Sequence, residues 1–168
     1  GVQTCALPIY STNFYGEYFT HWPEYQTIAR HPTSGLVMGY VIGKAEGEKE
    51  DWHGHVSAVT VAPTFRRLGL GEGLMAHLED VSESVHNAYF VDLFVRSSNG
   101  VARQMYERLG YTVYRKVLSY YQGDGTGPFP NAEDALDLRR AMKRDKERSK
   151  SSVIPLEKPI RPDQLEWQ

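Results

Sequence analysis

The stretch that most constrains this chain runs over residues 55–81 and reads HVSAVTVAPTFRRLGLGEGLMAHLEDV. It predicts a strand, then a basic and glycine-rich turn, then a helix. In the strand, apolar residues fall at Val56 and Ala58 and then shift to Val59 and Val61. A period of two that slips by one residue indicates a β-bulge. We therefore expect backbone N–H and C=O groups here that turn away from the neighbouring strand and can bind a ligand.

The turn after this strand, RRLGLG, has the composition of a phosphate-binding turn. Arg66 and Arg67 precede Gly69 and Gly71. Backbone amides at the start of a helix, with two cations beside them, suit a pyrophosphate. The chain has no Gly-Lys-Ser/Thr for a P-loop, and Leu74 breaks the G-x-G-x-x-G dinucleotide pattern. The remaining alternative is that the two arginines are ordinary surface charges.

Length and charge set the class of protein. The chain has 168 residues, enough for one domain with a sizeable core. Its net charge of −2 gives no strong attraction to nucleic acid or to a membrane, and no run of 18 apolar residues occurs. Cys5 is the only cysteine, which excludes a disulfide framework and fits a reducing compartment. We therefore expect a cytoplasmic protein without direct contact to nucleic acid or membrane.

The two ends of the chain differ in composition from its middle. Residues 1–9, GVQTCALPI, resemble the translation of a sequencing-adapter read, so we expect them to be an artefact; a genuine but unusual N-terminus is the alternative. Residues 10–142 are expected to form the domain. Residues 143–168 begin with a charge run and contain three prolines, which predicts an extended, solvated tail.

Helix and strand patterns alternate along the domain, which argues for a mixed α/β sheet. The strand over 88–95 is almost unbroken apolar sequence, as in a strand buried on both faces, and Asp92 interrupts it. The elements expected are a helix over 13–22, strands over 24–31 and 36–46, a loop over 46–54, the strand and helix of 55–81, a strand over 88–95, a helix after residue 99, and a strand over 111–121. Residues 132–142 suit a helix or a strand equally well.

Two of these helices carry apolar stripes. Phe14, Tyr18 and Trp22 lie on one face of the first, and this stripe faces either the core or a partner. In the helix after residue 99, Val101, Met105 and Leu109 form one stripe, and Ala102 and Tyr106 lie together beside it.

Two motifs together resemble those of a known family. The bulged strand followed by Arg-x-x-Gly-x-Gly resembles the acetyl-CoA motif of the GNAT acetyltransferase fold. Asn99, Ala102 and Tyr106 in SNGVARQMYERLGY resemble the Asn-x-x-Ala-x-x-x-Tyr segment of the same fold. Asn99 is also a good helix N-cap. The longer segments HWPEY, MGYVIGKAEG, WHGHVSAVTVAP, FVDLFVR and GYTVYRKVLSYY resemble the catalytic subunits of N-terminal acetyltransferase B, from about residue 10 to the end.

The resemblance implies the fold, the reaction and the partners. The fold is a mixed, mostly antiparallel sheet with flanking helices, and the first strand and first helix of the family are expected to be missing here. The implied reaction moves an acetyl group from acetyl-CoA to the α-amine of nascent polypeptides that start Met-Asp, Met-Glu, Met-Asn or Met-Gln. The implied partner is a large helical-repeat auxiliary subunit that brings the enzyme to the ribosome. Two alternatives remain open: a GNAT enzyme that acetylates lysine or a small amine, and a CoA-binding module without turnover.

The same resemblance assigns roles on the acetyl-CoA side. The backbone N–H of Val61 is expected to stabilise the developing oxyanion, and Tyr106 is expected to donate a proton to the leaving thiolate. Asn99 is the third residue expected to take part in catalysis. The acetyl-CoA contacts implied are Val59, Val61, Arg66, Arg67, Gly69, Gly71, Asn99 and Tyr106.

The peptide side is implied to use Tyr10, His55, Ser57, Tyr120 and Tyr121. A histidine beside hydroxyl groups can donate to carboxylate and to amide oxygens, as the second residue of these peptides requires. Tyr120 and Tyr121 point to opposite faces of a strand, so we expect only one of them to line the groove, and the choice stays open. His53 lies near His55 in sequence, but no third ligand has a suitable spacing, so no metal is expected. The family's Glu two residues before Tyr10 is Pro8 here, which weakens that part of the match.

Overall fold

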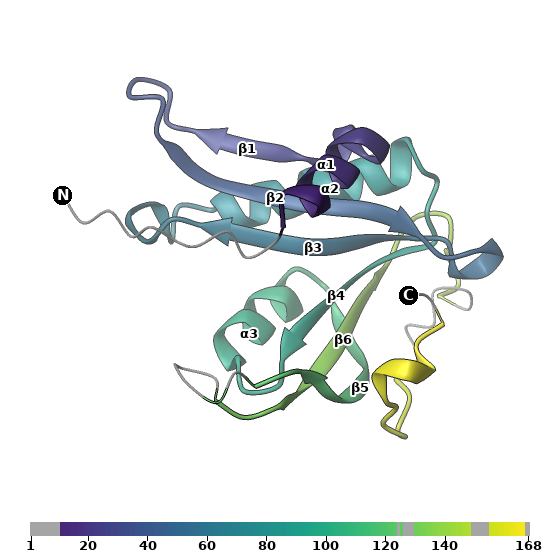
Figure 1. The fold of residues 1–168 in the computed structure, drawn as a ribbon. Helices are drawn as coiled ribbons and strands as arrows, with labels where there is room; N and C mark the ends of the chain where they lie inside the picture. The colour runs from purple at the N-terminus through teal and green to yellow at the C-terminus, as the bar shows by residue number, and fades with distance from the viewer. Residues whose placement is uncertain (1–10, 124, 126–129, 149–154, 167–168) are drawn as a thin grey trace.

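The computed structural model describes residues 11–123, 125, 130–148 and 155–166, and its centre is a six-stranded sheet in the order β1-β2-β3-β4-β6-β5 (Figure 1). β3 and β4 run parallel, and the other neighbouring strands are antiparallel. This confirms the expected mixed, mostly antiparallel sheet with flanking helices. The helices and strands are α1 (Thr12–His21), β1 (Thr27–Arg30), β2 (Val37–Glu46), β3 (His53–Val61), α2 (Leu70–Ser84), β4 (Phe90–Arg96), α3 (Gly100–Arg108), β5 (Thr112–Tyr121) and β6 (Glu133–Ala141).

The boundaries differ from the expected ones in three places. Pro23 starts a short 3₁₀ turn, Pro23–Tyr25, so the first strand begins only at Thr27. The expected loop over 46–54 contains the 3₁₀ turn Lys49–Asp51, and β3 begins at His53. Residues 133–141, whose pattern left helix and strand open, form β6 between β4 and β5. Residues 1–10, which include the expected artefact and Tyr10, lie outside the described part of the chain.

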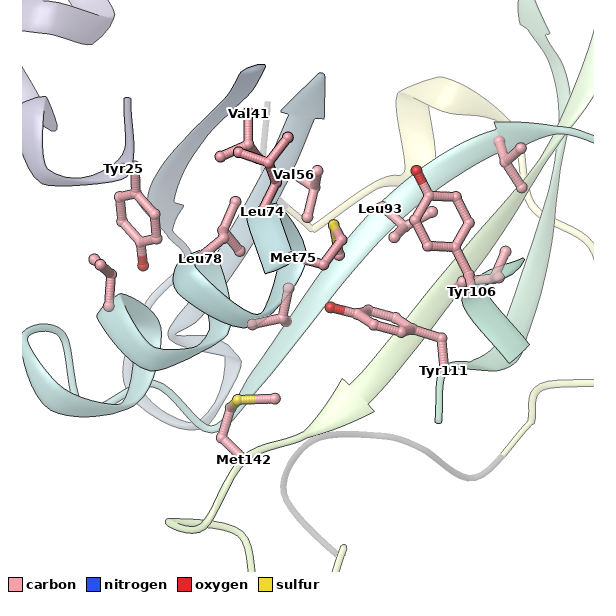
Figure 2. Packing of buried hydrophobic residues seen from close by; sticks show 14 of the residues in the cluster. Tyr25, Val41, Val56, Leu74, Met75, Leu78, Leu93, Tyr106, Tyr111 and Met142 are labelled. Carbon is pink, nitrogen blue, oxygen red and sulfur yellow. The ribbon is translucent and has the colours of Figure 1, made fainter. Parts of the chain in front are cut away.

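The main core lies between α2 and the sheet (Figure 2). Leu74, Leu78 and Val81 of α2 are buried against Val41 and Val56 of the sheet. A side chain of this kind contributes about 1.5–3 kcal/mol when it is fully buried. Spacings of four and three residues keep these three side chains on one face of the helix.

The aromatic stripe of α1 faces inward. Tyr18 is buried, Trp22 packs against the core, and Phe14 stacks on Tyr18 with ring centroids 4.2 Å apart. Phe19, on another face of the helix, is 56% exposed. Of the two interpretations that the sequence left equal, the structure therefore supports the core for Phe14, Tyr18 and Trp22.

Both stripes of α3 contribute to the core, except at Val101. Val101 is 83% exposed, whereas Tyr106 is only 7% exposed and packs edge-on against Tyr111 at 5.9 Å. Ala102, Met105 and Leu109 are partly buried and pack against the core beside Tyr106. Apolar spacing identified the two stripes but did not show that Val101 would stay exposed.

The predicted bulge is present in β3, and it precedes a split in the sheet. Ile42 pairs with Ala58 and Gly43 pairs with Val56, so one residue of β3 has no counterpart in β2. That residue is Ser57, slightly earlier than the slip read from the sequence. Beyond it, pairing between β3 and β4 stops after Val56, and the two strands spread apart towards α3 (Figure 1). None of the described helices has the length and apolar content needed to cross a membrane.

Candidate active site

The gap between β3 and β4 exposes backbone groups of β3. Ala62 N–H donates to Met38 O at 2.8 Å, so the backbone N–H and C=O of Ala62 point towards β2. In an antiparallel pair these groups alternate from residue to residue. The backbone groups of Val59 and Val61 therefore point away from β2, into the gap where β4 has already diverged. This is the arrangement expected of an N–H donor for a thioester oxygen.

The glycine-rich turn lies next to this gap. Gly69 has a φ of +77°, and no side chain caps the start of α2, so the first amides of the helix are left for a ligand. A Cβ at Gly71 would meet only Met105 Sδ at 3.8 Å and Val61 Cγ2 at 3.9 Å. Gly71 thus lies between the end of β3 and α3, and a side chain at this position would narrow the gap between these two elements. The arrangement fits a pyrophosphate in front of α2 and a thioester arm running towards Val61.

The two arginines of the turn are exposed and differ in geometry. Arg66 Nε donates to Val61 O at 3.1 Å, which ties its side chain to the end of β3. Arg67 has a φ of +67°, a left-handed conformation that is uncommon outside glycine. Both cations lie in front of the uncapped helix, where they add positive potential for a phosphate. Their contact with acetyl-CoA stays a prediction.

α3 holds the two other residues expected on the acetyl-CoA side. Asn99 Oδ1 accepts from Ala102 N–H at 3.1 Å and so caps the helix, as its residue type predicted. Burial raises the pKa of Tyr106 to about 12, so its hydroxyl stays protonated at neutral pH. A protonated hydroxyl is what a proton donor to a leaving thiolate requires. The structure gives Asn99 a structural role, and a catalytic role for it stays a prediction.

A pocket of about 300 Å³ opens beside His55. Its lining combines charged residues of β2 and β3 with apolar residues of β4, β5 and the C-terminal segment. The lining residues are Lys44, Glu46, His55, Phe94, Tyr120, Pro162 and Leu165. Of the five residues expected to bind peptide, His55 and Tyr120 thus line this pocket. Its volume is large enough for a single peptide side chain.

The structure decides between the two tyrosines of β5. Tyr120 stacks on Phe94 with ring centroids 4.8 Å apart and lines the pocket. The guanidinium of Arg96 lies 4.3 Å from the ring centroid of Tyr121, which contacts the Tyr120 ring edge-on at 5.1 Å and is not among the residues that line the pocket. Tyr120 is therefore the one that can face a peptide in this pocket.

Ser57 and Tyr10 complete the set expected on the peptide side. Ser57, the bulge residue, has its hydroxyl 2.8 Å from the hydroxyl of Tyr18 on α1. This contact joins α1 to the strand that carries His55. Tyr10 lies outside the described residues.

His55 is held by a carboxylate of the next strand. Its Nδ1 lies 2.7 Å from Asp92 Oδ1, and His55 and Asp92 are paired in the parallel ladder between β3 and β4. Burial lowers the pKa of His55, but the charge and hydrogen bond of Asp92, with Glu46 beside them, outweigh burial and raise that pKa above its ordinary value. Since Nδ1 is engaged by Asp92, Nε2 is the ring nitrogen left for a ligand in the pocket.

Asp92 belongs to a row of alternating charges across the sheet. It pairs in register with Arg139 of β6, and Asp137 of β6 accepts from Arg139 Nη2 at 3.0 Å and from Arg115 Nε at 2.9 Å. Arg139 also lies 3.7 Å from the ring centroid of Tyr114. Burial raises the pKa of Asp92. The nearby charges of His53 and His55 have the larger opposite effect, so the pKa of Asp92 lies below its ordinary value. The row keeps Asp92 ionised and thereby keeps His55 oriented.

The fold brings further possible metal ligands to His53 and His55, so the argument from sequence spacing against a metal site is wrong. Sequence spacing offered no third ligand beside His53 and His55, yet the fold brings Glu46 and Asp92 to them. One ligand atom from each of the four lies within 4.8 Å of the others. By donor type this set can hold a divalent cation. In the described structure the same atoms form the hydrogen bond and ion pairs that fix His55, so the expectation of no metal stays a prediction.

Most residues that line the pocket were not predicted from the sequence. Lys44 and Glu46 fell at the end of an ordinary strand, and Phe94 belonged to an apolar run. Pro162 and Leu165 lay in a segment expected to be a solvated tail. The one available signal was Asp92, a single charge inside a strand buried on both faces, because buried charges are almost always paired.

Comparisons with known proteins agree with this geometry. The model of the acetyltransferase (GNAT) family matches residues 3–111. The N-terminal acetyltransferase complex ARD1 subunit homolog of Leishmania donovani is 69% identical over 159 residues, 94% of this chain and 86% of the relative. The N-terminal acetyltransferase B complex catalytic subunit NAA20 of Arabidopsis thaliana is 52% identical over 158 residues, 94% of this chain and 84% of the relative.

Two solved structures are also similar. The Chaetomium thermophilum Naa20 in complex with a bisubstrate analogue superposes with a TM-score of 0.83 at 36% identity, covering 93% of this chain and 86% of that one. A NatB acetyltransferase complex bound to a bisubstrate inhibitor gives a TM-score of 0.78 at 32% identity, covering 94% of this chain and 86% of that one.

The split sheet, the glycine-rich turn and the family match define a GNAT acetyltransferase, and the use of acetyl-CoA follows from that class. Within that family, the chain belongs to the catalytic subunits of N-terminal acetyltransferase B. It is therefore an N-terminal acetyltransferase.

Proposed function

We propose that this enzyme acetylates the α-amine of polypeptides that begin Met-Asp, Met-Glu, Met-Asn or Met-Gln. The observation that carries this proposal is the pocket in which His55, held through Nδ1 by Asp92, lies beside Lys44. The free Nε2 can donate to a carboxylate oxygen or to an amide oxygen when the ring is protonated, and the raised pKa favours that form. These two acceptors are the ones that distinguish such second residues from all others.

The reaction needs little from the protein besides positioning. An α-amine has a pKa near ~8, so a fraction of it is neutral at physiological pH and water suffices as the base. Acetyl-CoA, when bound, supplies the acyl group as a thioester. The Val61 N–H donates to the carbonyl oxygen as charge develops on it. Tyr106 gives its proton to the sulfur as the C–S bond breaks and the C–N bond forms, and it recovers a proton from solvent.

We further propose that the enzyme works in the cytoplasm as one subunit of a heterodimer. The partner is a large helical-repeat auxiliary subunit, which carries the enzyme to the ribosome. The NatB complexes among the solved relatives support a catalytic subunit paired with an auxiliary one. Exposed apolar side chains on α1 and on the β1–β2 hairpin also suit a partner surface. They are Phe19 at 56%, Ile28 at 51%, Leu36 at 60% and Val37 at 45% exposure.

A peptide panel tests the acceptor class. The full-length protein, co-expressed with its auxiliary subunit, is given acetyl-CoA and peptides that differ only in their first two residues. Met-Asp and Met-Asn peptides are expected to give kcat/KM values at least ~100-fold above Met-Leu, Ser-first and Ala-first peptides, because the site's buried polar groups would otherwise lack partners. CoA release measures the rate. Faster acetylation of Ser-first or Ala-first peptides would refute the proposed acceptor class.

Charge reversal in the glycine-rich turn tests the acetyl-CoA side. Arg67→Glu is expected to raise the KM for acetyl-CoA by about tenfold or more, since it replaces a cation near the pyrophosphate by an anion. The KM for peptide should stay within about twofold. Lys146→Glu is the matched control, because it makes the same charge change on an exposed residue after β6, far along the sheet from the turn. Unchanged acetyl-CoA kinetics in Arg67→Glu would remove Arg67 from the site.

A further inference from the structure

The C-terminal segment, residues 155–166, is part of the sheet's edge rather than a solvated tail. Leu156 N–H donates to Tyr114 O at 2.6 Å, and Ile160 N–H donates to Lys116 O at 3.0 Å. Leu118 N–H in turn donates to Ile160 O at 2.8 Å, which makes a parallel bridge to β5. The segment therefore covers the outer edge of β5, which would otherwise present unpaired backbone groups.

After this bridge the chain turns back over the pocket. A 3₁₀ turn, Pro162–Gln164, is closed by Arg161 N–H donating to Gln164 Oε1 at 2.9 Å. The turn places Pro162 and Leu165 on the pocket that also holds His55 and Tyr120. Figure 1 shows this turn, in yellow, beside β5. The segment thus supplies part of the apolar lining of a pocket whose charged residues are Lys44, Glu46 and His55.

An ion pair fixes the end of the segment. Glu166 accepts hydrogen bonds from Arg115 Nη1 at 2.7 Å and from Arg115 Nη2 at 2.6 Å. This bidentate ion pair fixes the orientation of the two side chains. The Arg115 side chain is 1% exposed, whereas that of Glu166 is 45% exposed. Arg115 also donates to Asp137 at 2.9 Å, so it keeps one carboxylate partner if Glu166 is removed. Loss of Glu166 should therefore loosen the segment without leaving a buried charge unpaired.

We propose that residues 156–166 form a wall of the acceptor pocket, in which Leu165 contacts the methylene groups of the peptide's second residue. Glu166 is a positioning residue that holds Leu165 in place through Arg115. This inference rests on the proposed function, because it assigns the pocket to the acceptor peptide. It makes acceptor binding depend on a segment that follows the sheet and helices in the chain and pairs with β5.

The test separates the two substrates. Using the full-length protein with its auxiliary subunit and a Met-Glu peptide, Leu165→Ala and Glu166→Gln are each expected to raise the peptide KM about fivefold or more. The KM for acetyl-CoA and the kcat at saturating peptide should stay within about twofold, as expected when binding of one substrate alone is weakened. Glu166→Asp keeps the charge and should recover part of the loss. Glu157→Ala is the control, an exposed carboxylate of the same segment without an ion pair to any residue that the structure describes.

Hydrogen exchange gives a second readout. The amides of Leu118 and Ile160 should become more protected from exchange when a bisubstrate analogue binds the wild type. The gain in protection should be smaller in Glu166→Gln. A wild type that acetylates Met-Glu peptides while Leu165→Ala keeps its peptide KM would overturn the inference alone. Equal rises in both KM values, with a lower Tm, would also overturn it, since that result marks a merely structural segment. A wild type that acetylates none of the Met-first peptides would overturn the proposed function and this inference with it.

Discussion

Tyr106→Phe is expected to lower kcat by about 100-fold while leaving both KM values within about twofold. The change removes only the hydroxyl, so the ring still packs against Tyr111 and into the core. A positioned proton donor contributes about 10²–10⁴-fold, and the lower end applies here because a thiolate is already a fair leaving group. Since burial raises the pKa of Tyr106 to about 12, the wild type should keep this donor protonated up to pH ~10. Steady-state CoA release measures the effect.

Tyr111→Phe is the matched control for this variant. Tyr111 is equally buried and lies beside Tyr106, but its hydroxyl donates to Glu79 Oε1 at 2.9 Å on α2. Its removal should cost about 1 kcal/mol of unfolding free energy and leave kcat unchanged. If Tyr106→Phe keeps full kcat, or if Tyr111→Phe loses as much, the hydroxyl of Tyr106 is not the proton donor.

Asp92→Asn is expected to lower the free energy of unfolding by about 3 kcal/mol near pH 6. The amide keeps the size of the side chain but leaves His53, His55 and Arg139 without their shared negative charge. Breaking a buried ion pair from one side costs about 3–5 kcal/mol, and the amide's remaining hydrogen bond to His55 places this variant at the lower end. Urea unfolding, followed by fluorescence, measures the difference.

The pH dependence of that difference follows from two pKa shifts. The pKa of Asp92 is lower in the folded protein than its ordinary 3.8, so its contribution is complete above that value and is lost as the pH falls through the folded pKa. The pKa of His55 is above its ordinary 6.5, so its contribution is complete below that value and is lost as the pH rises through the folded pKa. The gap between wild type and Asp92→Asn should therefore be largest near pH ~5–6 and smaller towards pH ~3 and pH ~9.

Asp80→Asn, an exposed carboxylate on α2, provides the control and should change stability by less than about 0.5 kcal/mol at every pH. A flat difference across the pH range would mean that Asp92 acts through packing rather than through its charge.

How far the sequence predicts this protein depends on the range of the interactions involved. Helical spacing located α1 and α2, and residue type and flanking turn residues located β2 and β5, because these signals act over a few neighbouring positions. The slip from Val56 to Val59 revealed the bulge, because both residues pack on the same core. The sequence pattern could not decide whether residues 133–141 form a helix or a strand, or which side chains of α3 are buried. Those depend on which neighbours cover them.

The residues proposed to bind acetyl-CoA could be predicted from the sequence because they are close together in the chain. Val59, Val61 and the turn from Arg66 to Gly71 lie within one strand–turn–helix unit, so their order in the chain is also their order in space. The proposed acceptor pocket is assembled from five separate segments, and the sequence indicated only His55 and the tyrosine pair through resemblance. Lys44, Asp92 and Leu165 enter the site only when the sheet is formed.

By itself, the sequence predicted a bulged strand followed by a glycine-rich turn suited to phosphate, because both depend on local backbone geometry and residue type. The GNAT family was indicated by the resemblance of these motifs to those of known members, and the family match confirms it. Only the tertiary structure decided that Asp92 orients His55, that Tyr120 rather than Tyr121 faces the pocket, and that the C-terminal segment closes it. The physical reason is that strand register and edge pairing bring together residues far apart in the chain. The Arg115–Glu166 contact spans 51 residues, and no pattern within a single segment specifies it.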